Sequence, residues 1–183
     1  KFAGINVDAW YGDVSDVANV YTVGLSADYT VSDINLSSFV RYSEQDNDAD
    51  SDDISALKVG VSANMGIFSA FLGYGESGKD GYVALDGNSS ATTFDEHWRV
   101  GLFADDAEII FANVGAQVTD TVNVSLRHSN LDSEVANEDK KETYVQVVYS
   151  MSSNLYTLVR FGEYKAEGDD AQTSGRVQVG YSF

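Results

Sequence analysis

Apolar and polar residues alternate along most of the chain with a period of two, which is the pattern of a β-strand with two different faces. The segment 174–183 at the carboxy-terminus shows this alternation without a break. Its two faces carry Val177, Val179, Tyr181 and Phe183 on one side and Arg176, Gln178, Gly180 and Ser182 on the other. The pattern therefore predicts a terminal amphipathic strand that ends on an aromatic residue.

The same alternation recurs through the rest of the chain. It predicts strands at Phe2–Tyr11, Tyr21–Tyr29, Ile34–Tyr42, Leu57–Ala63, Phe68–Tyr74, Glu108–Thr119, Val122–Ser129, Thr143–Met151 and Leu155–Tyr164. The segment His97–Phe103 is compatible with one more short strand. The total of about ten strands, each near the 9–11 residues that cross a membrane as a tilted β-strand, indicates a transmembrane sheet.

The connections between these strands are sorted by length. Short turns and long polar loops alternate, with the turns at Ser32–Asp33, Asn64–Gly66, Asp120–Thr121 and Ser152–Asn154 and the loops at Ser43–Asp53, Gly75–Asp106, Asn130–Lys141 and Lys165–Thr173. Transmembrane barrels have short periplasmic turns and long external loops, whereas soluble sandwiches are not sorted in this way. We therefore predict an all-β, antiparallel, up-and-down transmembrane β-barrel over residues 1–183, with a long inserted loop at 75–106.

Aromatic residues fall in two groups near the predicted strand ends. One group is Tyr29, Phe68, Tyr149, Tyr156, Tyr181 and Phe183, and the other is Trp10, Tyr11, Tyr21, Tyr42, Tyr74 and Tyr164. Aromatic girdles at both membrane interfaces are typical of such barrels. A soluble β-domain would instead place most of its aromatic residues in the middle of its strands.

Composition narrows the choice of function. The chain has no Cys and no Pro, and 29 acidic against 11 basic residues give a net charge of −18. Nucleic acid is excluded as a partner, because phosphate binding needs positive charge. No apolar run approaches the roughly 20 residues of a transmembrane helix. No signal peptide is recognisable, so an outer-membrane protein would lack the amino-terminal part of its precursor in this sequence.

Over nearly its whole length the chain resembles the carboxy-terminal portion of the Campylobacter-type major outer membrane porins. The resemblance rests on the order of strands, turns and loops in Ile34–Tyr74, Asp106–Asn130 and Lys141–Phe183. It implies a trimeric barrel of roughly 16–18 strands around a water-filled channel, of which this chain would form the carboxy-terminal part. A small barrel of about ten strands, complete in itself, is the alternative that an even strand count also permits.

Basic residues are scarce, and five of them lie on the polar faces of predicted strands. They are Arg41, Lys58, Arg127, Arg160 and Arg176. A cation exposed to lipid at mid-depth costs about 2–4 kcal/mol, so we expect these side chains to point into the lumen as one basic wall. Taken singly, each could also be a polar filler that pairs with a neighbouring carboxylate.

The long segment Gly75–Asp106 has no period of two and carries several carboxylates, among them Asp86, Asp95 and Glu96. We expect it to fold inward and narrow the pore, because long loops without periodicity are usually functional. The resemblance implies a calcium ion at the constriction, with Asp86 as the matching residue. A solvated acidic loop explains the same carboxylates without a metal, and a calcium site needs about six to eight oxygen ligands.

These observations predict an outer-membrane porin that lets small hydrophilic solutes and ions diffuse passively and favours cations. A structural or adhesive barrel with a closed lumen is the alternative, and a soluble extracellular β-protein is a third. No enzyme is predicted, because His97 and His128 lack a nucleophile nearby and His128 is expected at a solvated rim. No cofactor is expected apart from the implied calcium. Expected partners are outer-membrane lipid, lipopolysaccharide and further copies in a homotrimer.

Overall fold

The computed structural model describes residues 2–47, 54–81, 98–100, 105–134 and 139–183. Ten strands make up this part of the chain. They are β1 (Phe2–Val14), β2 (Ala18–Val31), β3 (Ile34–Asn47), β4 (Ile54–Met65), β5 (Phe68–Ser77), β6 (Ala107–Thr119), β7 (Val122–Ser133), β8 (Lys140–Ser150), β9 (Leu155–Ala166) and β10 (Gln172–Tyr181). No helix in the described ranges is long and apolar enough to cross a membrane.

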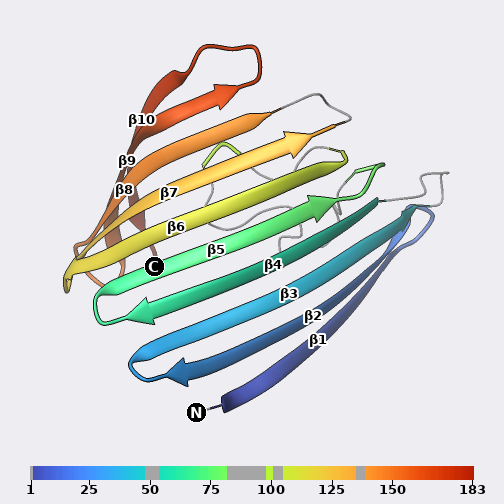
Figure 1. Ribbon diagram of the computed structural model, residues 1–183, viewed down its shortest axis with the longest axis horizontal. Coiled ribbons are helices and arrows are strands. Elements are labelled where there is room, and N and C mark those ends of the chain that lie inside the picture. Colours follow the sequence, from blue (N-terminus) through green and yellow to red (C-terminus); the bar gives the residue numbers. More distant parts are fainter. Residues whose placement is uncertain (1, 48–53, 82–97, 101–104, 135–138) are drawn as a thin grey trace.

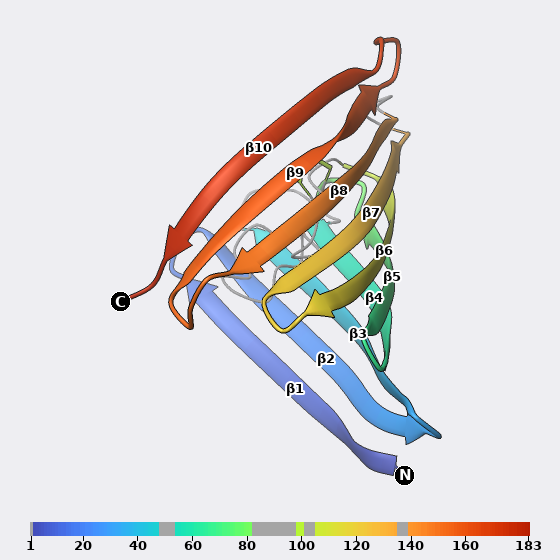
Figure 2. The same cartoon turned by 90° about the vertical axis from the view of Figure 1, so that its left-hand side faces the viewer.

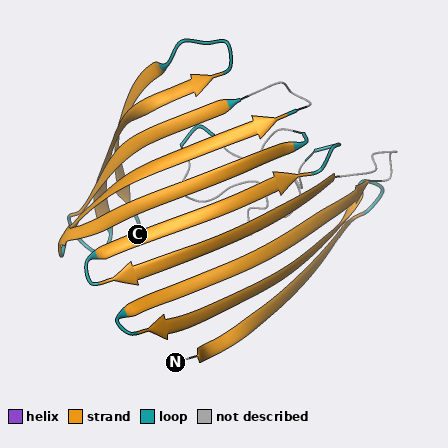
Figure 3. Ribbon diagram, viewed as in Figure 1, coloured by secondary structure: helices purple, strands orange, loops and turns teal. Residues whose placement is uncertain are grey.

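All ten strands form one sheet in which each strand pairs with its neighbours in sequence (Figures 1 and 3). Every pair is antiparallel, so the prediction of an up-and-down β-architecture is confirmed. The sheet curls strongly, with β1 and β10 at its two edges (Figure 2). It is a partial barrel, because β1 and β10 are not paired with each other in the part that the structure describes.

The alternation of the sequence becomes two different surfaces, which we call the concave and the convex face. In β2, Val20 and Thr22 are buried on the concave face, whereas Val23 and Leu25 lie exposed on the convex face. Large apolar side chains are exposed along the whole convex face, for example Val7, Val61, Leu72, Val145, Val177 and Val179. Since burying apolar area stabilises a protein by about 25 cal/mol per Å², the convex face is suited to contact with hydrocarbon rather than water.

Several strands run further into the acidic connections than the alternation predicted. Ser43–Asp53 was expected to be a solvated loop, but β3 continues to Asn47 and Ser43 is buried. Likewise β7 extends to Ser133, β8 begins at Lys140 and β9 ends at Ala166. The reason is that the ladder is made by backbone N–H and C=O groups, which pair whatever the side chains are.

The turns between β2 and β3 and between β4 and β5 each contain a residue with left-handed backbone. Ser32 has a φ of 53° and Gly66 a φ of 58°. Positive φ matches a tight turn to the right-handed twist of the two strands that it joins. We call the end of the strands where these turns lie the short-turn end, and the opposite end of the strands the long-loop end.

The largest buried apolar cluster lies on the concave face towards the long-loop end. Its members are Val100, Ala107, Ile109, Phe111 and Leu131, with Phe39, Phe71 and Tyr164 packed against it. Val100 comes from the long connection between β5 and β6, so part of that connection is seated on the concave face. A hydrophobic core of this kind fixes a segment inside the curl of the sheet.

Candidate functional site on the concave face

Two arginines, from β7 and β9, lie over one tyrosine of β8, and a third arginine on β10 is the register partner of the second. Register places Tyr144 directly opposite Arg127, and Arg160 directly opposite Arg176. The guanidinium carbon of Arg160 lies 5.3 Å from the centre of the Tyr144 ring, and that of Arg127 lies 6.0 Å from it. Both distances are in the range of a cation–π contact, so the ring stabilises two like charges on one wall. We call these four residues the basic cluster.

Neighbouring polar groups hold the guanidinium groups of this cluster in place. Arg160 Nε donates a hydrogen bond to Gln146 Oε1. Arg127 Nε donates to Ser125 Oγ over 3.2 Å. Gln146, Ser125 and Tyr144 are all buried, which restricts the directions that the arginines can take. Arg127 and Arg160 are therefore preorganised rather than freely moving surface charges.

The other two predicted cations lie apart from the basic cluster, on β3 and β4. Arg41 Nη2 forms an ion pair with Asp8 Oδ1 at 2.7 Å, and Lys58 lies directly opposite Arg41. The ion pair crosses β2, because Asp8 on β1 and Arg41 on β3 both lie directly opposite Gly24. A Cβ at Gly24 would come within 2.9 Å of Asp8 Cγ. Lys58 is only 6% exposed. The five cations thus form two groups instead of one continuous wall.

An aromatic strip separates the two groups. Phe39 and Phe71 stack at 6.4 Å between ring centres, and Phe71 meets Phe111 at 5.7 Å. Gly60, on the strand between the first two rings, makes room for them, since a Cβ there would lie 2.8 Å from Phe39 Cζ and 2.9 Å from Phe71 Cε2. This strip was not predicted from the sequence, although Phe39 and Phe71 are the aromatic residues on strand faces that otherwise carry polar residues and glycines.

The segment Trp98–Val100 lies against the wall made by β8, β9 and β10. The Trp98 and Arg99 backbone N–H groups donate to the two carboxylate oxygens of Glu142, at 2.8 and 2.7 Å. This segment is not a strand, so the expected short strand at His97–Phe103 is wrong for the three residues that the structure describes. Asp86, Asp95 and Glu96, expected at the constriction, lie outside the described residues.

Calcium has no visible binding site in the described ranges, where no three Asp, Glu or His side chains converge. The residue that the resemblance implied, Asp86, is not among those described.

Tyrosines of the two expected girdles divide between the faces. Tyr21, Tyr42 and Tyr149 are exposed on the convex face as expected. Tyr164 instead lies under Arg99 on the concave face, with 4.4 Å between the guanidinium carbon and the ring centre. Tyr156 accepts a hydrogen bond from Gln178 Nε2 on the same face, over 3.2 Å. Period two explains the difference, because these two residues are in phase with Arg160.

His128 was expected at a solvated rim, but it lies in the middle of β7 on the convex face. Its Nδ1 is 2.7 Å from Thr143 Oγ1, and both side chains are exposed. The contact links two convex side chains of adjacent strands. It therefore belongs to the outer surface and not to the concave site.

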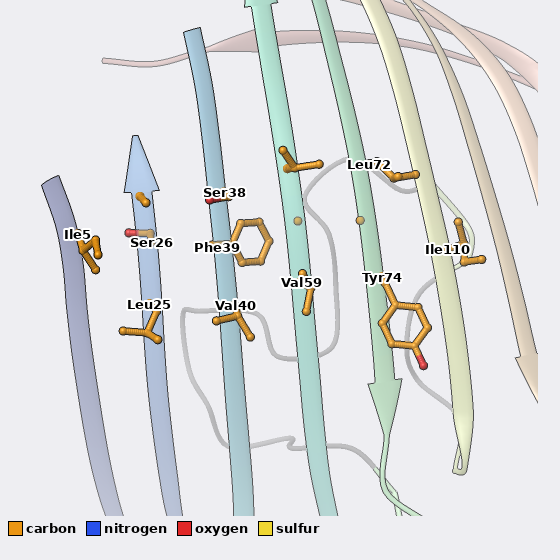
Figure 4. A pocket seen from close by; sticks show the side chains of 14 residues that line it. Ile5, Leu25, Ser26, Ser38, Phe39, Val40, Val59, Leu72, Tyr74 and Ile110 are labelled. Atoms are coloured by element: carbon orange, nitrogen blue, oxygen red, sulfur yellow. The ribbon is translucent and has the colours of Figure 1, made fainter. Parts of the chain in front are cut away.

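A shallow concavity of about 650 Å³ lies on the convex face of the first six strands (Figure 4). Its lining is almost wholly apolar and includes Ile5, Leu25, Val40, Val59, Leu72 and Ile110 around the smaller Ala27 and Ser38. No lining residue is charged. The concavity is thus a feature of the apolar outer surface and is unrelated to the charged residues on the other side of the sheet.

An apolar convex face, a charged concave face and an up-and-down antiparallel topology together define a β-barrel of the outer-membrane class. The family model described as "Gram-negative porin" matches residues 1–169. The chain therefore belongs to the Gram-negative porin family and is a protein of the bacterial outer membrane. This finding does not single out the Campylobacter-type subgroup.

Solved porin structures share the fold at low sequence identity. Pseudomonas aeruginosa OpdQ and OpdL both match with a TM-score of 0.81 at 15% identity, covering 98% and 97% of this chain and 53% and 54% of their own. Acinetobacter baumannii OccAB4 matches with a TM-score of 0.74 at 20% identity, covering 97% of this chain and 49% of its own. The chain thus spans about half the length of these proteins. No curated protein matches the sequence.

Proposed function

We propose that the concave face lines a water-filled lumen through which small hydrophilic solutes and ions diffuse passively across the outer membrane. The observation that carries this proposal is the contrast between the faces: Arg127, Arg160 and Arg176 lie on one and exposed aliphatic residues on the other. Guanidinium groups are stable in a wet lumen but costly in hydrocarbon. Charge of this kind would bias which solutes pass and orient dipolar ones.

We also propose that these strands are part of a larger barrel. The sheet has two open edges, β1 and β10. In a membrane each unpaired backbone N–H or C=O group costs several kcal/mol, so an open edge exposed to lipid is not tolerated. Further strands between β10 and β1 would pair both edges and close a lumen. The alternative, a structural or adhesive barrel with a closed lumen, predicts the same edges but no conductance.

A channel fits the described residues better than an enzyme does. His128 contacts Thr143 on the convex face, on the opposite side of the sheet from the basic cluster. Catalysis by histidine needs a nucleophile or substrate within hydrogen-bonding distance in a site that a substrate can enter. The convex position next to lipid provides no such site.

Acidic residues at the long-loop end support a preference for cations. Exposed carboxylates gather there, namely Asp13, Asp46, Asp105, Glu134, Asp139, Asp169 and Asp170, and the net charge is −18. Charges at a pore mouth raise the local concentration of counter-ions. We propose that these carboxylates give the pore its preference for cations, which the arginines of the wall reduce in part.

The preference for cations should fade as salt rises. The Debye length is about 10 Å at 0.1 M and about 3 Å at 1 M, so exposed mouth charges are screened at high salt. Reversal potentials measured across a planar bilayer in a salt gradient should show cation preference near 0.1 M KCl and much less near 1 M. Anion preference at the lower concentration would refute the proposal.

We further propose that the porin forms homotrimers through the convex face of β7–β10. The exposed apolar positions of β2 extend over Tyr21–Val31, whereas those of β8 and the residue just after its end run only from Val145 to Met151. A strand rises by about 3.3 Å per residue, so this band is shorter than the ~25 Å apolar band of an outer-membrane barrel. If another copy covers this face, its polar part contacts protein and no longer faces hydrocarbon.

Polar residues replace the missing apolar ones on these strands. His128, Thr143 and Glu163 are exposed, and register places Thr143 opposite both of the others. These three side chains form a row with an imidazole ring and a carboxylate. Such a row can form hydrogen bonds or ion pairs with the same row, or with its neighbours, on a second copy. Desolvated polar groups need such partners.

Engineered cysteines test this arrangement, because the natural chain contains none. Thr143→Cys should give disulfide-linked oligomers on mild oxidation of outer membranes. Val59→Cys, which is also exposed on the convex face but on β4, is the matched control and should remain monomeric on denaturing gels. Equal cross-linking of the two variants would contradict the proposed interface.

Lipopolysaccharide is proposed as a partner at the rim above this face. Lys141 and Lys165 lie directly opposite each other, exposed at the long-loop ends of β8 and β9. Two like charges in one cross-strand pair are unfavourable unless an anion lies between them. Lipid phosphate groups would supply that anion at the height of the head groups.

A further inference from the structure

A buried carboxylate on β8 fastens the segment Trp98–Val100 to the concave wall. Glu142 is 2% exposed and accepts the N–H groups of Trp98 and Arg99 at 2.8 and 2.7 Å. Burying an ionised carboxylate is costly unless strong donors satisfy its oxygens. Two charge-assisted hydrogen bonds to consecutive backbone groups satisfy both oxygens with a fixed geometry.

Each residue of this segment contacts a different part of the wall. Trp98 meets the edge of Tyr144 with 5.6 Å between ring centres. Arg99 lies 4.4 Å over the ring of Tyr164 and donates from Nη1 to Ser174 Oγ at 3.2 Å. Val100 is fully buried in the apolar cluster of β6 and β7. The segment is therefore tied to five strands, with Glu142 as its backbone attachment.

Tyr144 connects this segment to the basic cluster. Its ring is contacted by Trp98 and by the guanidinium groups of Arg127 and Arg160. Glu142 precedes Tyr144 by two residues on the same face of β8. It thus brings a negative charge next to the cluster while it holds the segment there.

We propose that Glu142 is the positioning residue of the lumen. It fixes the inward segment and so limits the free cross-section, and its charge partly offsets the field of the basic cluster. The first role concerns the segment itself, whereas the second rests on the proposed channel function. Removing the carboxylate should therefore have two separable effects, a looser segment and a pore less selective for cations.

Cysteine labelling tests the attachment without any need for conduction. Val100→Cys should react slowly with a water-soluble maleimide, because the residue is fully buried. Adding Glu142→Ala removes both charge-assisted hydrogen bonds and should raise the rate at least roughly tenfold, which is the change expected for losing even one of them. Adding Glu142→Gln should raise it less, because the amide keeps one acceptor oxygen.

The control variant removes the same charge from the other face. Glu108 on β6 is exposed on the convex side and lies outside the proposed subunit interface, so Glu108→Gln should leave the labelling rate unchanged. The chain has two tryptophans, so Trp10→Phe leaves Trp98 as the only tryptophan whose fluorescence a second measurement can follow. Glu142→Ala should then make Trp98 more accessible to acrylamide. An unchanged labelling rate together with unchanged quenching would overturn the proposal.

Bilayer recordings separate this proposal from the proposed function. If the natural protein conducts, Glu142→Ala should raise its single-channel conductance and reduce its cation preference, and Glu108→Gln should change neither. Faster labelling with unaltered conductance would refute the claim that the segment limits the cross-section. If the natural protein does not conduct, the channel proposal fails, while labelling still decides whether Glu142 holds the segment.

Discussion

Replacing Gly162 by alanine is expected to prevent most molecules from folding into a stable barrel. Gly162 in β9 lies directly opposite Tyr144 in β8. A Cβ at this position would overlap the carbonyl oxygen of Thr143 and the Cβ of Tyr144, and would lie 2.6 Å from Tyr144 Cα. Two of these atoms belong to the neighbouring backbone and the Cβ is fixed to it, so none can turn away and the two strands would have to separate.

The free energy of unfolding should fall by more than the roughly 1–3 kcal/mol of ordinary overpacking, because a paired strand cannot relax as a side chain does. Urea unfolding in lipid vesicles, followed by the shift between folded and unfolded bands on unheated gels, measures it. Gly175→Ala is the matched control, since a Cβ there has its nearest neighbours at 3.6 Å, namely Arg160 O and Phe161 Cδ2. Equal stability of the two variants would contradict this account of the β8–β9 contact.

Replacing Arg160 and Arg176 together by glutamine should shift ion selectivity markedly towards cations. The two residues are directly opposite on β9 and β10 and share the concave face. Glutamine keeps a hydrogen-bond donor but removes both charges, and charges within about 10 Å of a passing ion act on it at 0.1 M salt. The reversal potential in a KCl gradient should become more cation-selective, with a smaller change at 1 M.

A second pair of cations provides the control for this experiment. Lys141 and Lys165 are also directly opposite each other, but they lie exposed on the convex face. Replacing both by glutamine removes the same charge from the outer surface. Its effect on selectivity should be much smaller than that of the arginine pair. Equal shifts would show that the change in selectivity comes from net charge and not from the position of the arginines on the lumen wall.

The architecture could be predicted from the sequence because a period of two assigns every strand residue to a face. The ten strands and their antiparallel order follow from that period and from the sorted turns. Strand ends could not be predicted, as β3 shows by continuing to Asn47 through acidic residues. There the backbone ladder persists because the charged side chains remain solvated at the long-loop end.

The contacts that the concave residues make could not be predicted from the sequence. Alternation puts Arg41 on the concave face, but its ion pair with Asp8 depends on register and on Gly24 between them. Glu142 looks like an ordinary polar position of β8. Its partners are the backbone groups of Trp98 and Arg99, 44 and 43 residues away along the chain, and only tertiary folding brings them together.

Single-channel recording in planar lipid bilayers tests the central claim most directly. The purified, natively folded porin should insert in discrete conductance steps, with cation selectivity at 0.1 M KCl that weakens as salt rises. This result would support a wet lumen lined by the concave face. Folded protein that inserts into the bilayer without conducting would contradict the claim and favour a barrel with a closed lumen.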